Sequence, residues 1–136
     1  MHAGVNAVIL VHGIDIIDVA RVATMLDTHG QTFIDRCFTK TEQDAADVSS
    51  SDIRAQRFAA RYAAKEAVLK ALGTGLSGGI NWVDVSVSRE DGPPMVTLYG
   101  RAAEIAADLG ICEWKLSLSH AGGMAMASVI GTGGTK

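Results

Sequence analysis

The segment 57–75 places one carboxylate and several cations beside an apolar helix face. Its large apolar residues share one stripe at about 100° per residue, which predicts a core-facing side: Phe58, Tyr62, Leu69 and Leu72. Lys65 points along this stripe, and Glu66 lies on its edge, one turn before Lys70. A carboxylate and two amines beside an apolar stripe indicate a binding site rather than a solvated face.

A second carboxylate, Asp15, follows a run of β-branched residues. Two interpretations of Asp15 stay open: it caps the next helix, or it joins Glu66 in holding Mg²⁺, which prefers one or two carboxylates, several waters and substrate phosphates. Glu66 also has two interpretations. It is either a metal ligand or the partner of Lys70 in an ordinary ion pair four residues apart.

The cations near Glu66 are typical of polyphosphate recognition, which needs several positive charges beside a metal-binding carboxylate. Arg61, Lys65 and Lys70 share its helix, although the amine of Lys65 could instead extend past the stripe to water. The glycine-rich segment 73–79 either offers backbone N–H groups to a phosphate or simply ends the helix. It is not a Walker loop, because the pattern GxxxxGK[ST] is absent.

His120 ends an alternating strand pattern at the start of a turn, where it is either a structural or a functional histidine. The nearby Ser117 and Ser119 are not part of a Gly-x-Ser-x-Gly elbow, which argues against serine hydrolase chemistry.

The pattern of the chain predicts an α+β domain, with an antiparallel sheet packed against one long helix plus shorter helices. Helices are expected at 19–29, ended by Gly30, around 33–38, after the capping box Thr39-x-x-Glu42, and at 102–109. The long helix is expected to begin at an Asp52 N-cap. Strands are expected at 8–14, 83–88, 95–99, 114–119 and 124–130, the middle two forming a hairpin whose first strand is half-buried.

Length and composition are those of a single soluble domain spanning 1–136, with flexible ends at 1–6 and 131–136. The chain has 48% hydrophobic and 20% charged residues, and its net charge of −3 gives no support for nucleic-acid binding. Cys37 and Cys112 form no CxxC pair, and no segment is typical of a membrane span or a signal peptide. We therefore expect a cytoplasmic protein without membrane contacts.

Three blocks together resemble the holo-acyl-carrier-protein synthase family, the small 4′-phosphopantetheinyl transferases. They are 13–17 with Arg21, 61–75, and 117–120 before the last strand. The segments 82–85 and 92–96 also fit the hairpin of that family. Order and spacing agree from about 8 to 130, and the middle block is the most specific.

The resemblance implies transfer of the phosphopantetheine arm of coenzyme A to a serine of apo acyl carrier protein, with release of 3′,5′-ADP. Asp15 and Glu66 would bind Mg²⁺, and Lys70 would steady the bridging phosphates as the third catalytic residue. The proton of the serine would pass either to Glu66 or to a metal-bound water. The positions implied around the nucleotide and its 3′-phosphate are Arg61, Lys65, Gly73, Thr74, Gly75, Pro94 and His120.

The resemblance also implies partners. Acyl carrier proteins are acidic, so Arg21 and Arg36 are the expected docking residues. The family is typically homotrimeric, with active sites at subunit boundaries, and serves fatty acid biosynthesis; the sequence leaves open whether this carrier serves fatty acids or polyketides. Two alternatives remain: a non-catalytic coenzyme A or nucleotide-binding module of the same fold, and a purely structural oligomerisation domain.

Overall fold

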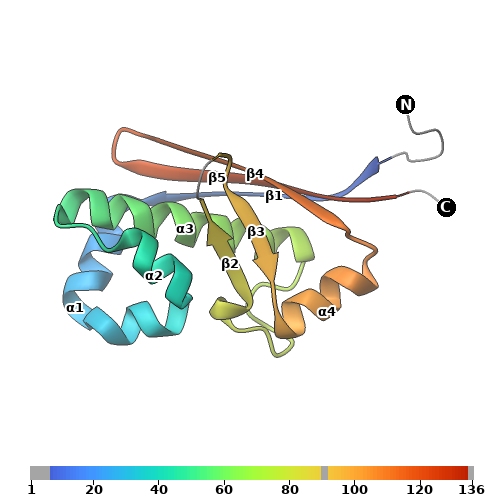
Figure 1. Cartoon of the computed structure of the whole chain (residues 1–136), viewed down its shortest axis with the longest axis horizontal. Helices are drawn as coiled ribbons and strands as arrows, with labels where there is room; N and C mark the ends of the chain where they lie inside the picture. The colour runs from blue at the N-terminus through green and yellow to red at the C-terminus, as the bar shows by residue number, and fades with distance from the viewer. Residues whose placement is uncertain (1–6, 90–91, 135–136) are drawn as a thin grey trace.

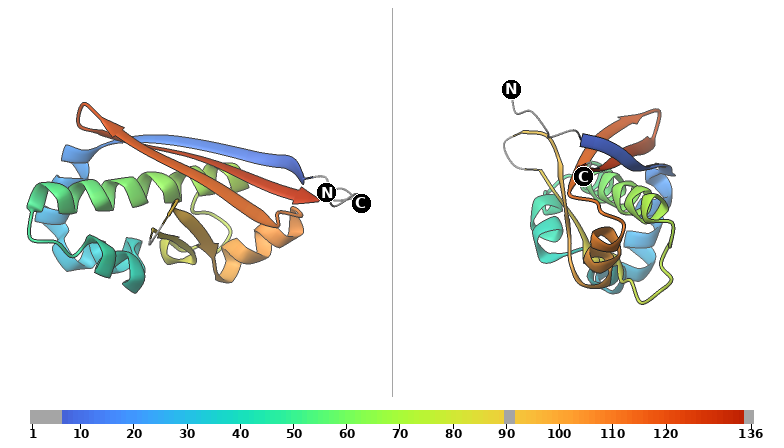
Figure 2. Two further views of the ribbon diagram at one scale, coloured as in Figure 1. Left: turned by 45° about the horizontal axis from the view of Figure 1, so that its top comes forward. Right: turned by 90° about the vertical axis from the view of Figure 1, so that its right-hand side faces the viewer.

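The long helix α3 (Ser51–Leu72) lies between two layers of the molecule. A computed structural model describes residues 7–89 and 92–134. An antiparallel sheet covers one side of α3, and shorter helices with a separate hairpin cover the other (Figure 1; Figure 2, left). This arrangement confirms the predicted α+β class and the packing of a sheet against one dominant helix.

Helix α3 is bounded by side-chain and glycine caps. Ser50 is its N-cap and accepts a hydrogen bond from the N–H of Ile53 at 3.3 Å, so the expected cap, Asp52, lies in the first turn instead. Gly73 ends the helix in the left-handed region, with φ 79°, which glycine adopts without a Cβ clash.

Helix α3 is buried on most of its circumference, not along one stripe. Its alanines pack on several sides with the larger apolar residues, because a helix covered by two layers has few positions left for solvent. The buried alanines are Ala55, Ala59, Ala63, Ala64, Ala67 and Ala71. Predicting a single core-facing side was therefore too narrow.

The sheet has three antiparallel strands in the order β1-β5-β4: β1 (Ala7–Asp18), β4 (Glu113–Ala121) and β5 (Met124–Gly134). Gly13 of β1 packs against the backbone of α3. A Cβ built there would lie 1.9 Å from the carbonyl oxygen of Ala67, so the helix approaches this closely only because residue 13 has no side chain.

Two strands, β1 at the edge and β5 in the centre, run further than the sequence pattern predicts. Strand β1 continues past Ile14 to Asp18, and Asp18 accepts a hydrogen bond from the N–H of Ala20 as the true N-cap of the next helix. Capping by Asp15 was therefore the wrong interpretation. Strand β5 continues to Gly134, paired with Ala7, so 131–134 are not a flexible tail; residues 1–6 and 135–136 lie outside the described residues.

Helix α1 (Val19–Cys37) is interrupted at Gly30, where φ is 51° and ψ is −130°. The predicted end of a first helix at Gly30 thus corresponds to a kink between two helical pieces. Helix α2 (Lys40–Ala46) begins with the predicted capping box, in which Thr39 and Glu42 each accept a backbone N–H from the other.

The hairpin is a two-stranded sheet of its own, not part of the main sheet. A 3₁₀ turn, η1 (Trp82–Asp84), leads into β2 (Val85–Ser88), which pairs with β3 (Met95–Leu98). The first three residues of β2 are all buried, so the strand is not half-buried as its alternation predicts, because α2 and α3 cover it. Helix α4 (Gly100–Asp108) follows β3.

No helix within residues 7–89 and 92–134 is long and apolar enough to cross a membrane.

Candidate functional site

Asp15 and Lys70 meet where β1 passes the last turn of α3. The Nζ atom of Lys70 donates to Asp15 Oδ1 at 2.8 Å and to the carbonyl oxygen of Ile14 at 3.2 Å. The side chain of Asp15 is 16% exposed and that of Lys70 is 55% exposed. The extension of β1 through Asp15 therefore presents this carboxylate to the helix rather than to a helix N-terminus.

Glu66 faces the same cluster and is half-buried. Burial raises the pKa of the Glu66 carboxyl, and the negative charge of Asp15 raises it further, while Lys70 and Arg21 act in the opposite direction. The ion pair of Lys70 within the described residues is with Asp15, so a simple pair between Glu66 and Lys70 does not account for Glu66. A bound cation would reduce the electrostatic repulsion between the carboxylates of Asp15 and Glu66.

The donor set fits Mg²⁺ as that ion is usually bound, through one or two carboxylates with water and phosphate oxygens completing its shell. In the described part of the chain, no three His, Cys, Asp or Glu side chains gather closely enough to form a protein-only metal cage. Asp15 and Glu66 would thus be the two protein ligands, with the remaining positions open to substrate.

A second feature is a cleft of about 650 Å³ on the other side of α3. Its walls come from α2, α3, β4 and the end of β2, and no acidic residue among 7–89 and 92–134 lines it. The polar side chains that line it are Gln56, Arg57, Arg61, Arg89, Ser119 and His120. Three guanidinium groups, those of Arg57, Arg61 and Arg89, make this cleft suitable for a phosphorylated ligand.

Arg61 is the deepest cation of the cleft, with 8% of the residue exposed. Its guanidinium donates to the carbonyl oxygen of Arg57 at 3.1 Å, while its Nε is buried and has no hydrogen-bond partner in the described structure. Burial lowers the pKa of Arg61; Glu42 counters this effect, and Arg57 and Arg89 add to it. A buried donor without an acceptor is costly, and an anion in the cleft would satisfy it.

The carboxylates and the cleft lie on opposite sides of α3. Asp15 pairs with Ala127, and Ala127 pairs with Leu118, so these three residues form a row across the inner face of the sheet. His120, two residues beyond Leu118, shares that face but belongs to the far edge strand. The edge strands β1 and β4 are about 10 Å apart, with β5 between them. Helix α3, itself about 10 Å wide, packs on this inner face of the sheet.

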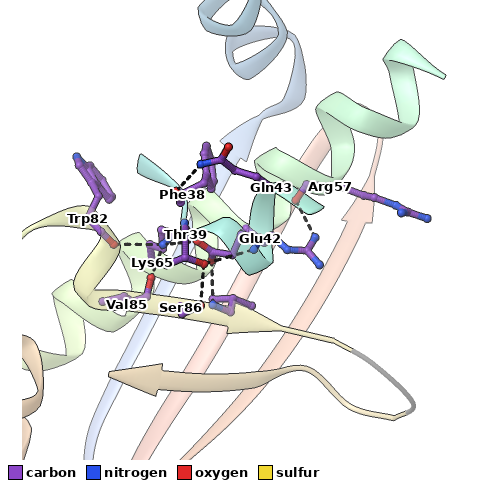
Figure 3. Close-up of polar contacts among 11 residues, drawn as sticks. Phe38, Thr39, Glu42, Gln43, Arg57, Lys65, Trp82, Val85 and Ser86 are labelled. Carbon is purple, nitrogen blue, oxygen red and sulfur yellow. Dashed lines mark hydrogen bonds and ion pairs between the residues drawn. The ribbon is translucent and has the colours of Figure 1, made fainter. Parts of the chain in front are cut away.

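Lys65 lies in the core, not beside a phosphate. Its side chain is 0% exposed, and Nζ lies 2.7 Å from Glu42 Oε1 in an ion pair (Figure 3). The same ammonium donates to the carbonyl oxygens of Trp82, at 3.2 Å, and Val85. All three donors of Lys65 are thereby used, which corrects both the expected nucleotide contact and the alternative of an amine reaching water.

The N–H groups of residues 73–75 also have partners within the chain. Gly73 donates to the carbonyl oxygens of Leu69 and Lys70, and Thr74 and Gly75 donate to Leu69, at 3.0–3.4 Å. The structure therefore uses this backbone to cap α3, as the simpler interpretation proposed, rather than to cradle a phosphate.

The remaining expected residues lie near the surface. Pro94 is half-buried next to β3, outside the lining of the cleft, whereas His120 is exposed and lines it. Arg21 and Arg36 are both exposed on α1, and Arg21 is close enough to influence Glu66.

Three contributing residues were missed from the sequence: Glu42, Arg57 and Arg89. Arg57 carried a signal, since it precedes Arg61 by four residues and therefore shares its helix face. Glu42 was explained fully by the capping box, which uses only one of its oxygens. Its pairing with Lys65 depends on a tertiary contact that spacing does not reveal.

Comparison with known proteins agrees with this geometry. Residues 12–122 match the model of the 4′-phosphopantetheinyl transferase superfamily. Holo-[acyl-carrier-protein] synthase of Chloroflexus aurantiacus is 43% identical over 137 residues, covering 92% of this chain and 99% of that protein.

Two solved structures share the fold over nearly their whole length. Plasmodium yoelii acyl carrier protein synthase with ADP bound has a TM-score of 0.82 at 28% identity, covering 96% of this chain and 99% of the other. The holo-(acyl-carrier-protein) synthase of Bacillus anthracis in complex with CoA (3′,5′-ADP) has a TM-score of 0.74 at 31% identity, covering 92% and 97%. The chain therefore belongs to the 4′-phosphopantetheinyl transferase superfamily, within its holo-[acyl-carrier-protein] synthase family.

Proposed function

We propose that this protein transfers 4′-phosphopantetheine from coenzyme A to a serine hydroxyl of apo acyl carrier protein and releases 3′,5′-ADP. The observation that carries the proposal is the convergence of Asp15, on β1, with Glu66 and Lys70, which lie more than 50 positions later on α3. Attack of a hydroxyl on a pyrophosphate needs charge neutralisation and alignment of the reactants more than it needs a protein nucleophile. The cluster of Asp15, Glu66 and Lys70 would supply the charge neutralisation.

Each residue of the cluster has a separate role in the proposal. Asp15 and Glu66 would hold Mg²⁺, which supplies Lewis-acid polarisation of the pyrophosphate when bound. Lys70 lies at the surface beside Asp15 with its side chain 55% exposed, so its ammonium would reach phosphate oxygens and stabilise the charge of the departing 3′,5′-ADP. The attacking oxygen comes from the carrier protein, so the cluster needs no nucleophile of its own.

The basic cleft would hold the nucleotide end of coenzyme A. Arg57, Arg61 and Arg89 offer guanidinium donors to its 3′-phosphate, and His120 offers a ring nitrogen at the mouth. The unpartnered Nε of Arg61 supports this assignment because it needs an acceptor that the described residues do not provide. In this proposal the nucleotide role passes from Lys65 to these arginines.

One chain presents the two halves of the site on opposite sides of α3, so we propose that coenzyme A lies between two copies. Its pyrophosphate would meet the carboxylates of one copy while its 3′-phosphate enters the cleft of the next. The outer face of the sheet offers a surface for assembly, since it leaves Ile9, Ile14, Ile16 and Met126 exposed. We propose that three copies assemble in this way into a homotrimer.

The acidic carrier protein would approach α1, where Arg21 is exposed beside Glu66 and Arg36 lies in the last turn. This places the incoming serine near the carboxylates. We further propose a cytoplasmic role in fatty acid biosynthesis, a process that uses holo acyl carrier protein as its carrier.

The test is to incubate the protein with coenzyme A, Mg²⁺ and apo acyl carrier protein and to weigh the carrier by mass spectrometry. The expected result is a carrier heavier by one phosphopantetheine group. An unmodified carrier across several carrier proteins, with a known transferase active in parallel, would refute the proposal. Binding of coenzyme A without any transfer would instead support the alternative of a non-catalytic binding module.

A further inference from the structure

Four elements meet at the buried pair formed by Glu42 and Lys65 (Figure 3). Glu42 comes from α2 and Lys65 from α3, and their remaining partners belong to η1 and β2. Both side chains are 0% exposed. The pair therefore joins the segments that cover one side of the long helix.

Every polar atom of the pair is used. Glu42 Oε1 accepts from the N–H of Thr39 at 2.8 Å as well as from Lys65, and Oε2 accepts from the N–H of Val87 at 2.8 Å. Lys65 distributes its other two donors to Trp82 and Val85. Such a saturated cluster fixes directions as well as distances, because each hydrogen bond weakens when its angle changes.

A buried ion pair is weak as a source of stability alone, since well-packed apolar residues of similar volume often serve as well. What apolar contacts lack is direction. The hydrogen bonds of Glu42 and Lys65 set the angle and height at which β2 lies over α3.

The same segments form the walls of the basic cleft. Val87, held through its N–H by Glu42, lines the cleft, and Arg89 follows two residues later. Ala45, one turn after Glu42, lines the cleft too, and its carbonyl oxygen accepts from Arg57 at 2.7 Å. Lys65 lies one turn beyond Arg61, so the pair stands directly behind the cationic wall.

We propose that Glu42 and Lys65 are positioning residues that set the cleft to the dimensions of the nucleotide. They touch no substrate; their hydrogen bonds fix Arg89, beyond β2, relative to Arg61 on α3, so that both cations line one cleft. The identity of that ligand as the 3′,5′-ADP part of coenzyme A rests on the proposed function.

The test compares Lys65→Met and the double variant Glu42→Gln/Lys65→Met with the wild type. The double variant removes both charges together, which avoids leaving a buried carboxylate unpaired if the single variant does not fold. The control is Lys40→Met, which removes an exposed ion pair to Asp44 from the same helix, α2. Titration calorimetry measures 3′,5′-ADP binding, and steady-state kinetics measure the KM for coenzyme A and for the carrier.

The expected result is 3′,5′-ADP binding about tenfold to a hundredfold weaker in the folded variant, a similar rise in the KM for coenzyme A, and an unchanged KM for the carrier. Lys40→Met should match the wild type. Unchanged 3′,5′-ADP affinity in a folded variant that lacks the pair would overturn the inference.

Amide hydrogen exchange separates this inference from the proposed function. Faster exchange confined to α2 and the β2–β3 hairpin, with the main sheet unchanged, supports positioning even if wild-type protein binds no 3′,5′-ADP, a result that would refute only the proposed function. Uniformly faster exchange throughout the chain would mean that the pair contributes only general stability, contrary to the inference.

Discussion

Replacing Glu66 by Gln should remove transfer activity while leaving the fold intact. The carboxylates of Asp15 and Glu66 face the cations Lys70 and Arg21, so this cluster has no net charge before a metal arrives. Glu66→Gln leaves it with one net positive charge. Mg²⁺ would then meet a site that lacks one of its two ionised ligands and repels it.

The size of the loss follows from the charge removed. A preorganised charged or hydrogen-bonding group that stabilises a developing charge is worth roughly 3–4 kcal/mol, or about 10²–10³-fold in rate. We expect kcat/KM for the carrier to fall by at least this factor. Half-saturation with Mg²⁺ should also move to a higher concentration, which a mere change in carrier docking would not cause.

The stability of the same variant gives an independent readout. Because the pKa of Glu66 is raised from 4.5 in the folded protein, its contribution to stability is fully present below about pH 4.5 and is lost as the pH rises through the folded pKa. In metal-free buffer at neutral pH, Glu66→Gln should therefore be at least as stable as the wild type, and this advantage should disappear on acidification.

The assay is carrier modification followed by mass spectrometry over a series of Mg²⁺ concentrations, with urea unfolding at several pH values. The control is Glu104→Gln, which removes an exposed carboxylate paired with Arg101 on α4. Full activity at the wild-type Mg²⁺ requirement in Glu66→Gln would refute the assignment of Glu66 to a metal site.

Three further predictions test other parts of the molecule. Arg61→Met should weaken coenzyme A binding by about 10–100-fold, as expected for the loss of a charged hydrogen bond. The variant should also bind coenzyme A and 3′-dephospho-coenzyme A with more similar affinities than the wild type does. If the ratio of these two affinities stays at the wild-type value, the 3′-phosphate does not bind at Arg61. Gly13→Ala should lower the free energy of unfolding by about 1–3 kcal/mol or prevent folding, because the new Cβ meets Ala67. Gly134→Ala, with open space around it, should change little in the same urea experiment, and equal effects would contradict the packing argument. Arg21→Glu should raise the KM for the carrier, more strongly at low salt, with the KM for coenzyme A unchanged; a carrier KM equal to the wild-type value would exclude this docking role.

Sequence patterns located the elements better than the contacts between them. The capping box and the glycine after Leu72 are local signals, and both appear in the structure as predicted. Capping was one of the two interpretations left open for Asp15, because the strand pattern ends at Ile14, whereas pairing with β5 carries β1 to Asp18. Strand pairing of this kind depends on residues far apart in the chain, so the residue pattern of β1 alone does not predict it.

Lys65 shows the same limit within the candidate site. Helix periodicity correctly placed Lys65 on the core-facing side of α3, and the two interpretations left open were a phosphate contact and an amine that reaches water. The partner that satisfies it is Glu42, from a helix 23 positions earlier, whose role looked complete in its own capping box. A charge on an apolar face thus signals that a partner exists, but it does not tell a protein partner from a substrate.

The pairing of Ala7 with Gly134 brings the two ends of the described chain together at one end of the sheet. Asp15 lies eight residues along β1 from Ala7, roughly 26 Å away at the rise of a strand. An affinity tag or surface tether at either end would therefore leave the carboxylates clear. A short linker joining the two ends would also permit circular permutation, with the new opening placed at Gly122–Gly123, the turn between β4 and β5.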